Sequence, residues 1–231
     1  MTAFAKRSLQ VIDFGLSDYA SIYAQQKIWI DTLTDNFDDP DQPDILLMGE
    51  HYPVITRGRA SKEENLLEVL PETAVVSIER GGDVTYHAPG QLVVYPIYRL
   101  YPHERDLHQY LRRLETVVIA VLAAYDIEGI RQPGYTGVWV ESSSGGKEIT
   151  SKKIGYKKIA SIGVAVKHWV TYHGLSLNIN NPLTEFSQIN PCGLNASQMT
   201  RLGDLVTDQV DMTCVKAQLV EAFCGEFAAE S

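Results

Sequence analysis

The sequence predicts an α+β fold in which a mixed β-sheet carries flanking helices. Short apolar runs that are typical of strands recur along most of the 231 residues. Between them lies a long amphipathic segment, 107–125, whose apolar residues recur at helical spacing. After this segment the pattern returns to strands, from 137–141 to a predicted hairpin over 154–179. Mixed strands with a few helices between them are typical of the α+β class.

The first half of the chain supplies one helix and most of the predicted strands. Residues 8–14 alternate weakly and indicate a strand, and Ser17 is a plausible N-cap for a helix that runs to about residue 33. Residues 34–44 are rich in Asp, Pro, Asn and Gln, which indicates a loop. Further strands are predicted at 45–48, 54–56, 73–79 and 91–99, with a helical turn at 65–69.

The second half begins with the long helix, for which Asp106 is the predicted N-cap. A strand at 137–141 and a Ser/Gly turn at 142–146 follow, and then a hairpin of 154–166 and 169–179 around Lys167 and His168. Residues 180–203 are polar and loop-rich. We expect a single domain over 1–231 with a C-terminal helix within about 211–229 packed on it, although the part from about 200 could form a small appended subdomain.

Composition narrows the class of protein. The chain is 45% hydrophobic and 21% charged, which is ordinary for a folded soluble protein. A net charge of −9 argues against nucleic acid as a partner, and no apolar run approaches the roughly 20 residues of a membrane span. Without a secretory signal, and with three cysteines that form no disulfide framework, we expect a cytoplasmic monomer without membrane partners.

Lysines gather in one part of this acidic chain. Six of them lie between residues 147 and 168, with Glu148 as the single acidic residue. Such a cluster is usually a solvated face. The alternative is a docking site for an acidic partner.

No CxxC, HExxH, Walker or GxGxxG pattern is present, so the sequence predicts neither a metal nor a cofactor. Cys214 and Cys224 lie near the apolar stripe of the last helix and are expected to act as small buried hydrophobes. Cys192 differs because it lies between Pro191 and Gly193 in a polar loop. A turn of that kind can project a thiol into a cleft, although a structural role for Cys192 stays open.

A thiol nucleophile needs a base or a cation beside it, and the candidates are His51, His87, His173 and Lys158. If 154–166 is a regular strand, Lys158 shares a face with six apolar or aromatic residues. A charged group on such a face needs a partner, and a thiolate would be suitable. A strand shifted by one residue, or a lysine that snorkels at the strand end, would explain the pattern without chemistry.

A glycine-rich segment, 80–91, joins two predicted strands. Gly81 and Gly82 permit positive φ and a close approach of backbone to ligand. The same loop holds Arg, Asp, Thr, Tyr and His side chains, which favours a binding role over a plain hairpin turn.

Four segments together resemble a known family. They are RGGDVTYHAPGQ at 80–91, KIASIG at 158–163, HGLSLN at 173–178 and NPCG at 190–193. In this order and at these separations they resemble the lipoyl(octanoyl) transferases, also called lipoate–protein ligase B. The resemblance covers about residues 8–205, with flanking matches at 49–53, 56–59, 64–67 and 133–140.

The resemblance implies the fold shared by biotin and lipoate protein ligases. It implies transfer of an octanoyl group from octanoyl-acyl carrier protein to a lysine of apo lipoyl domains, without ATP, metal or cofactor. The acceptors would be the lipoyl domains of 2-oxoacid dehydrogenase E2 subunits and the glycine cleavage H protein. Cys192 matches the family's acyl-thioester cysteine, and Lys158 matches its partner lysine. The positions that match substrate contacts are Arg80, Gly81, Gly82, Asp83, Val84, Thr85, Tyr86, His87, Ser161, Ile162, Gly163, Gly174, Leu175 and Ser176.

The sequence departs from the family pattern at two places. Asp83 stands where many relatives have Gln, and the lysine-rich segment 142–157 is longer than usual. Three alternatives to a transferase stay open: an ATP-dependent lipoate or biotin ligase of the same fold, a hydrolase that pairs Cys192 with His173 or His87, and a non-catalytic module that binds acyl carrier or lipoyl domains.

Overall fold

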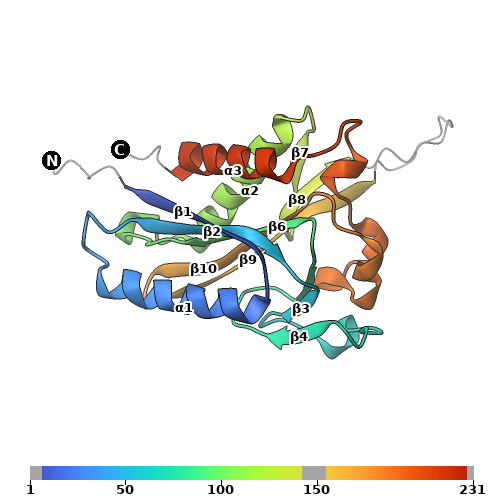
Figure 1. Ribbon diagram of the computed structural model, residues 1–231, viewed down its shortest axis with the longest axis horizontal. Helices are drawn as coiled ribbons and strands as arrows, with labels where there is room; N and C mark the ends of the chain where they lie inside the picture. The colour runs from blue at the N-terminus through green and yellow to red at the C-terminus, as the bar shows by residue number, and fades with distance from the viewer. Residues whose placement is uncertain (1–6, 142–154, 228–231) are drawn as a thin grey trace.

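The computed structural model describes residues 7–141 and 155–227, and it has the predicted mixture of one large β-sheet with flanking helices (Figure 1). Its α-helices are α1 (Tyr19–Asp35), α2 (Leu107–Ala123) and α3 (Met212–Phe227). Its strands are β1 (Leu9–Ser17), β2 (Asp44–His51), β3 (Val54–Arg57), β4 (Ala74–Ser77), β5 (Val84–His87), β6 (Gln91–Ile97), β7 (Gly129–Gln132), β8 (Tyr135–Glu141), β9 (Tyr156–Lys167) and β10 (Val170–Asn178).

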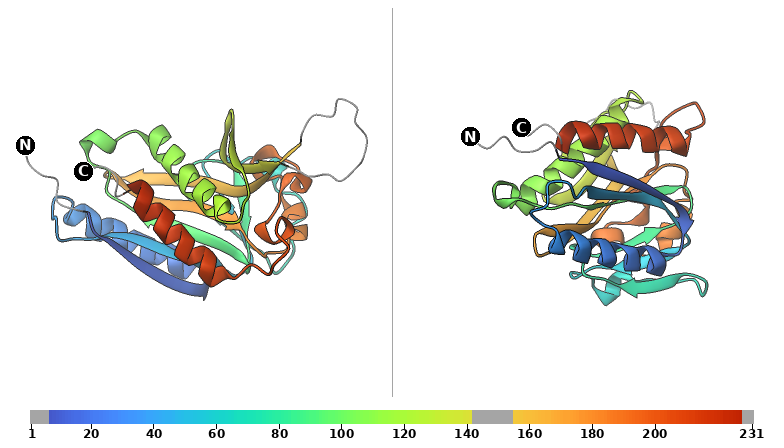
Figure 2. Two further views of the ribbon diagram at one scale, coloured as in Figure 1. Left: turned by 90° about the horizontal axis from the view of Figure 1, so that it is seen from above. Right: turned by 60° about the vertical axis from the view of Figure 1, so that its left-hand side comes forward.

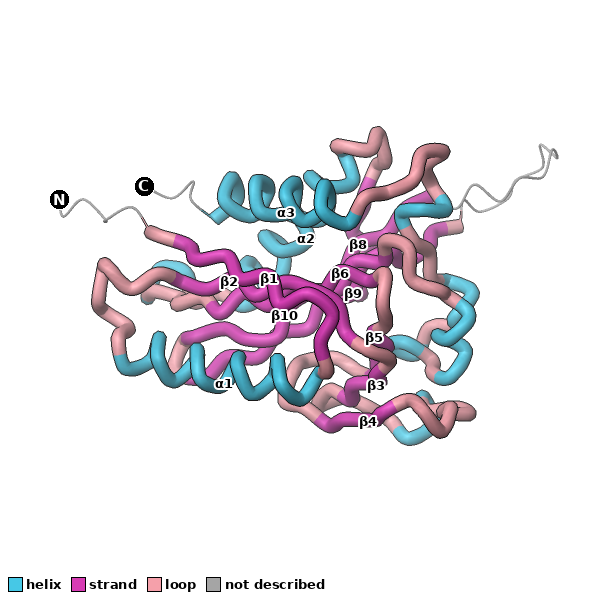
Figure 3. The backbone as a smooth tube through the Cα atoms, viewed as in Figure 1, coloured by secondary structure: helices cyan, strands magenta, loops and turns pink. Residues whose placement is uncertain are grey.

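Seven strands form the central sheet in the order β1-β2-β6-β10-β9-β8-β7. The β1–β2 pair is parallel, and every other neighbouring pair in this sheet is antiparallel. The remaining three strands form a small sheet in the order β4-β3-β5, which lies at one end of the molecule (Figure 3). The small sheet therefore covers one end of the central sheet.

Helices cover both faces of the central sheet, with α1 on one face and α2 and α3 on the other (Figures 1 and 2). Alternate residues of the central strands supply the two cores, because successive side chains of a strand point to opposite faces. In β2, Ile45 and Leu47 pack on the α1 side, and Leu46 and Met48 pack on the α2 and α3 side. A strand that is buried on both faces has a continuous run of apolar residues, which explains why residues 45–48 were correctly predicted as a strand.

The helix ends follow capping chemistry, with one correction to the sequence prediction. The N-cap of α1 is Asp18 and not Ser17, since the Asp18 carboxylate accepts a hydrogen bond from the Ser21 N–H at 2.8 Å. Ser17 ends β1, and its hydroxyl donates to the Phe14 carbonyl. The Asp106 cap of α2 is confirmed.

Two strands were not predicted. β5 lies inside the glycine-rich segment that the sequence analysis treated as a loop, and it pairs antiparallel with β3. Its Thr, Tyr and His residues resemble a polar loop in sequence, yet all four residues are buried. β7 was missed because it is a short, half-exposed edge strand that contains Arg131 and Gln132. The β9–β10 hairpin turn lies at His168 and Trp169, one residue later than predicted, and both residues have positive φ.

Helix α3 packs into the main core. Val215, Leu219, Phe223 and Phe227 are buried in the same cluster as the apolar face of α2. The expectation that Cys214 and Cys224 are buried is wrong, because both lie on the exposed side of α3. Within residues 7–141 and 155–227, no helix is long and apolar enough to cross a membrane.

Candidate active site

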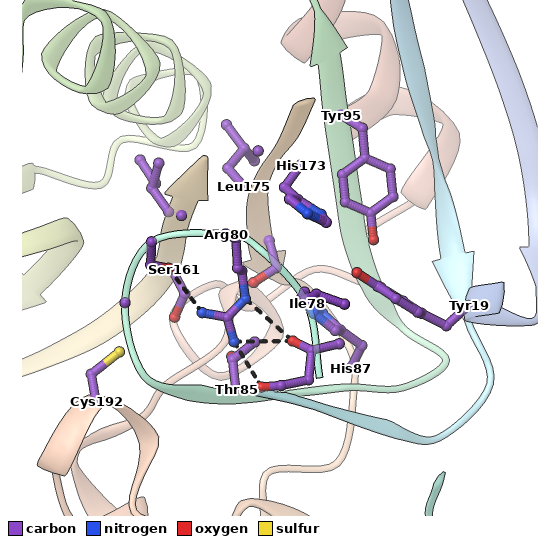
Figure 4. Close-up of a pocket in the computed structure, with 17 residues that line it drawn as sticks. Tyr19, Ile78, Arg80, Thr85, His87, Tyr95, Ser161, His173, Leu175 and Cys192 are labelled. Atoms are coloured by element: carbon purple, nitrogen blue, oxygen red, sulfur yellow. Dashed lines mark hydrogen bonds between the residues drawn. The ribbon is translucent and has the colours of Figure 1, made fainter. Parts of the chain in front are cut away.

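A pocket opens on the α1 face of the central sheet, where the small sheet and the loop after β10 meet it (Figure 4). Four segments that are far apart in sequence meet there, and most of the predicted substrate-binding residues line the pocket. The predicted residues that line it are Arg80, Gly81, Gly82, Thr85, His87, Ser161, Ile162, Gly163, Gly174, Leu175, Ser176 and Cys192.

Cys192 lies at the pocket on a strained turn. Its φ of 56° is a conformation that residues other than glycine rarely adopt, and Gly193 follows with a φ of 73°. The turn is anchored by a hydrogen bond from the Asn190 N–H to the Asn65 carbonyl at 2.9 Å. Cys192 is half-buried and lines the pocket, so a substrate in the pocket can reach it.

Lys158 reaches the same region through a β-bulge. Ala160 pairs with Val138, and Lys158 pairs with the next residue, Trp139, so Ile159 is an extra residue in β9. Lys158 therefore points to the opposite face from Ala160 and to the same face as Ser161. The sequence argument placed Lys158 with Ala160, Ile162 and Val164, and the bulge makes that assignment of faces wrong. The expectation that Lys158 is buried is confirmed, at 2% exposure.

The Lys158 side chain is packed between Trp139 and Gly137. Its Nζ is 5.6 Å from the centroid of the Trp139 ring. A Cβ on Gly137 would lie 2.4 Å from the Ala160 carbonyl oxygen and 2.8 Å from the Lys158 Cε, so this close packing of β8 against β9 and Lys158 requires glycine. Burial lowers the pKa of Lys158, and the nearby Cys192 thiolate opposes that shift. The lysine is thus a buried ammonium whose charge is favoured by the thiolate.

Arg80 is a second buried cation near the thiol. Its guanidinium donates to the Thr56 carbonyl at 2.7 Å, the Thr56 hydroxyl at 3.0 Å and the Gly81 carbonyl at 3.1 Å (Figure 4). Burial lowers the pKa of Arg80, and the Cys192 thiolate again opposes the shift. Because these three acceptors are neutral, the guanidinium charge is left to act on an anion in the pocket.

The glycine-rich loop crosses β9 in close contact. The Gly81 N–H donates to the Val164 carbonyl at 2.9 Å, and a Cβ on Gly163 would lie 2.8 Å from the Gly81 carbonyl oxygen. Gly82 has a φ of 85°, which suits glycine. These glycines bring the loop against the floor of the pocket.

Three predicted substrate-binding residues do not line the pocket. Successive side chains of β5 point to opposite faces, so Thr85 and His87 line the pocket while Val84 and Tyr86 pack into a separate apolar cluster. The Asp83 carboxylate instead accepts hydrogen bonds from the Lys62 and Val84 N–H groups and from the Asn65 side chain. Asp83 thus holds the loop in place.

The histidines at the pocket are neutral groups. Burial, with His51 as a second cause, lowers the pKa of His87 to about 3, and burial lowers the pKa of His173 to about 3. His51 lies behind the pocket, where its ring contacts the Ser17 carbonyl and the Tyr95 hydroxyl. A group with a pKa near 3 is a weak proton acceptor, so Lys158 is the better partner for the thiol.

Sequence reasoning missed part of the pocket wall. Tyr19, Thr56, Ile78 and Tyr95 line the pocket, and they lie outside the four motifs. Tyr95 lies within a strand buried along its whole length, where no sequence signal separates a pocket residue from a core residue. Among the described residues, no group of His, Cys, Asp and Glu could hold a metal ion.

The predicted lysine cluster is only partly described. Three of its members, Lys147, Lys152 and Lys153, lie outside the described residues. Of the others, Lys158 is buried at the site and Lys167 pairs with Asp31 at 2.8 Å.

Sequence comparison places this geometry in a known family. The model of the lipoyl protein ligase A/B catalytic domain matches residues 23–224. The chain is 40% identical over 213 residues to an octanoyltransferase of Pelobacter propionicus, which is 92% of each chain. It is 43% identical over 215 residues to an octanoyltransferase of Syntrophotalea carbinolica, which is 93% of this chain and 92% of that protein.

Solved structures show the same fold at low sequence identity. A lipoate-protein ligase A bound with ATP superposes with a TM-score of 0.62 at 14% identity, over 96% of this chain and 85% of that chain. A biotin protein ligase from Aquifex aeolicus, in complex with biotin and ATP, gives a TM-score of 0.51 at 12% identity, over 96% of this chain and 73% of that chain. The predicted resemblance to the fold of biotin and lipoate ligases is confirmed.

Proposed function

The chain belongs to the lipoyl protein ligase A/B catalytic-domain family, and from this premise we propose that it transfers an octanoyl group from octanoyl-acyl carrier protein to a lysine of apo lipoyl domains. The acceptors would be the lipoyl domains of 2-oxoacid dehydrogenase E2 subunits and the glycine cleavage H protein. One observation supports the proposal: the chain is similar to octanoyltransferases over nine-tenths of its length, and its Cys192 lines a pocket and interacts electrostatically with the buried Lys158.

The first step is acylation of Cys192. The thiolate attacks the carbonyl carbon of the donor thioester, and the bond between that carbon and the carrier sulfur breaks. The leaving carrier thiolate takes a proton from the Lys158 ammonium, which becomes a neutral amine. Because burial lowers the pKa of Lys158, it gives up this proton more readily than an exposed lysine would.

The second step reverses the protonation of Lys158. The acceptor lysine amine attacks the acyl-enzyme carbonyl, its extra proton passes to the neutral Lys158, and the Cys192 thiolate leaves. Both residues then return to their starting charge states. A thioester is activated in both steps, so the amide forms without a nucleotide.

The buried charges stabilise the anions of this cycle. Arg80 and Lys158 both interact electrostatically with the Cys192 thiolate, and this attraction favours the charged form of each cation. The octanoyl chain would lie over the small residues Gly163, Gly174 and Ser176 and beside Ile78 in the pocket.

The test is to incubate the chain with octanoyl-acyl carrier protein in the absence of ATP and to record the intact mass, followed by peptide mapping. We expect one octanoyl group on Cys192. This group should disappear when an apo lipoyl domain is added, and the lipoyl domain should gain an octanoyl amide. Cys192→Ser abolishes the adduct, whereas Cys224→Ser, a change on the exposed side of α3, leaves it intact.

Other outcomes would point to the alternatives. Transfer that requires ATP and leaves no adduct would indicate a ligase. Release of free octanoate without an acceptor would indicate a hydrolase. Tight binding of carrier or lipoyl domain without any transfer would indicate a binding module.

A further inference from the structure

The end of the pocket away from Cys192 is closed by four rings, which we call the ring wall: Tyr19, His87, Tyr95 and His173 (Figure 4). They come from α1, β5, β6 and β10, so four elements of the fold converge there. All four side chains are buried. Figure 4 shows Cys192 on one side of Arg80 and the labelled wall residues on the other.

A second layer of rings holds the wall from behind. Tyr23 stacks on Tyr19 and His173 with ring centroids 6.0 and 5.5 Å apart, and its hydroxyl donates to the Glu79 carboxylate. His51 is 5.2 Å from Tyr19 and contacts the Tyr95 hydroxyl. A wall ring therefore cannot swing away without displacing another ring.

His173 is held in place by its backbone as well. It has a φ of 55° within β10, and its N–H donates to the Gln26 side chain at 2.9 Å. The following residue is Gly174, where a Cβ would lie 2.1 Å from the Val94 carbonyl oxygen. The strained conformation fixes the direction of the imidazole, and such strain persists only where the surroundings impose it.

The wall carries buried polar atoms. The Tyr19 hydroxyl and both ring nitrogens of His173 are buried without a hydrogen-bond partner among the described residues. The nearest acidic oxygen to His173, on Glu79, is 4.0 Å away. Methylene groups pressed against such atoms would keep them from any hydrogen bond, which costs free energy.

We propose that the ring wall sets the length of the acyl chain that the pocket accepts, and that Tyr19 and His173 are the residues that stop the chain. This proposal rests on the proposed function, because it takes the chain to be attached at Cys192. A chain that ends before the wall is buried along its length. A longer chain must displace a ring that is packed from behind, or bury methylenes against unpaired polar atoms.

The experiment is a competition between octanoyl- and dodecanoyl-acyl carrier protein at equal concentration, read as the ratio of the two adducts on Cys192 by intact mass. The wild type is expected to carry octanoyl in large excess. Tyr19→Ala and His173→Gly should each raise the dodecanoyl-to-octanoyl ratio by at least about tenfold, the scale on which one methylene changes selectivity in a pocket.

Two features of the design keep the test decisive. Glycine adopts the φ of residue 173 without strain, so His173→Gly removes the ring from a backbone that suits glycine, even if Tyr19→Ala fails to fold. Phe37→Ala is the matched control, since the Phe37 ring packs edge-on against Tyr101 at 5.6 Å and does not line the pocket, and it should leave the ratio unchanged.

The proposal is overturned if the folded wall variants keep the wild-type ratio, or if the wild type takes dodecanoyl as readily as octanoyl. A wild type that forms neither adduct would instead refute the proposed function.

Discussion

Replacing Gly163 with alanine tests whether the glycine-rich loop must lie directly on β9. The added Cβ would be 2.8 Å from the Gly81 carbonyl oxygen and 3.3 Å from the Arg80 Cδ. Ordinary contacts of a Cβ begin at 3.4 Å, so the loop has to move by about 0.6 Å. Because the obstacle is backbone and not the end of a flexible side chain, the movement shifts the whole loop.

The expected cost has two parts. Overpacking of this kind destabilises a protein by about 1–3 kcal/mol. The hydrogen bond from the Gly81 N–H to the Val164 carbonyl, now 2.9 Å, would also stretch. Since a misplacement of about 1 Å can cost about a hundredfold in rate, a shift of about 0.6 Å should lower kcat/KM by about tenfold.

The measurements are urea unfolding and the rate of octanoyl transfer, each made with two control glycines. Gly81→Ala changes the loop residue that Gly163 packs against, but its Cβ would meet only the Val164 carbonyl oxygen, at the ordinary contact distance of 3.6 Å. Gly225→Ala in α3 meets no atom within 4 Å and should stabilise the helix by roughly 0.5–1 kcal/mol. If Gly163→Ala unfolds at the same urea concentration as Gly81→Ala and keeps its rate, the steric argument is refuted.

Three further predictions concern buried ionisable groups. Lys158→Met should slow alkylation of Cys192 at pH 7 by about tenfold or more, and should raise stability because a buried ammonium is removed. The alkylation is measured by peptide mapping, since the exposed cysteines of α3 also react, and an unchanged rate at Cys192 would contradict the pairing. His87 is neutral in the folded chain and protonated below pH 6.5 in the unfolded chain, so the wild type loses stability as the pH falls from 6.5 towards 3. In urea titrations, His87→Gln should reduce the slope of unfolding free energy against pH by up to about 1.4 kcal/mol per pH unit, and equal slopes for the two proteins would refute this prediction. Asp44→Ala should cost about 3–5 kcal/mol in the free energy of unfolding, since it leaves the Arg99 guanidinium buried without its carboxylate partner; a loss below about 1 kcal/mol would be inconsistent with a buried pair.

The elements that the sequence predicted well are those in which local chemistry and tertiary packing agree. The Asp106 cap and the apolar stripe of α2 both indicate a helix that begins at Leu107, so that helix was predicted with its correct start. β5 shows the opposite case, because its polar residues are buried only by the second sheet and the pocket. Ser17 and Asp18 are both favourable N-cap residues, so the sequence alone does not fix the start of α1. Asp18 is the N-cap because Ser17 belongs to the end of β1.

The Lys158 argument reached a buried lysine through an incorrect assignment of faces. Regular alternation would have turned this side chain towards α2, away from the pocket. The bulge at Ile159 reverses the direction, and a bulge depends on how β8 and β9 pair. A similar limit applies to Tyr95, because alternation within an entirely buried strand does not distinguish a core face from a pocket.

The sequence by itself determined the mixed fold class, the long helix, and four motifs that could be assigned to a family, because local periodicity, turn chemistry and motif order are written along the chain. Only the tertiary structure decided which of those residues face a common pocket, that Lys158 lies on the side of Ser161, and that rings from four elements close the far end. These features depend on strand register and on contacts between residues distant in sequence, which no local pattern encodes.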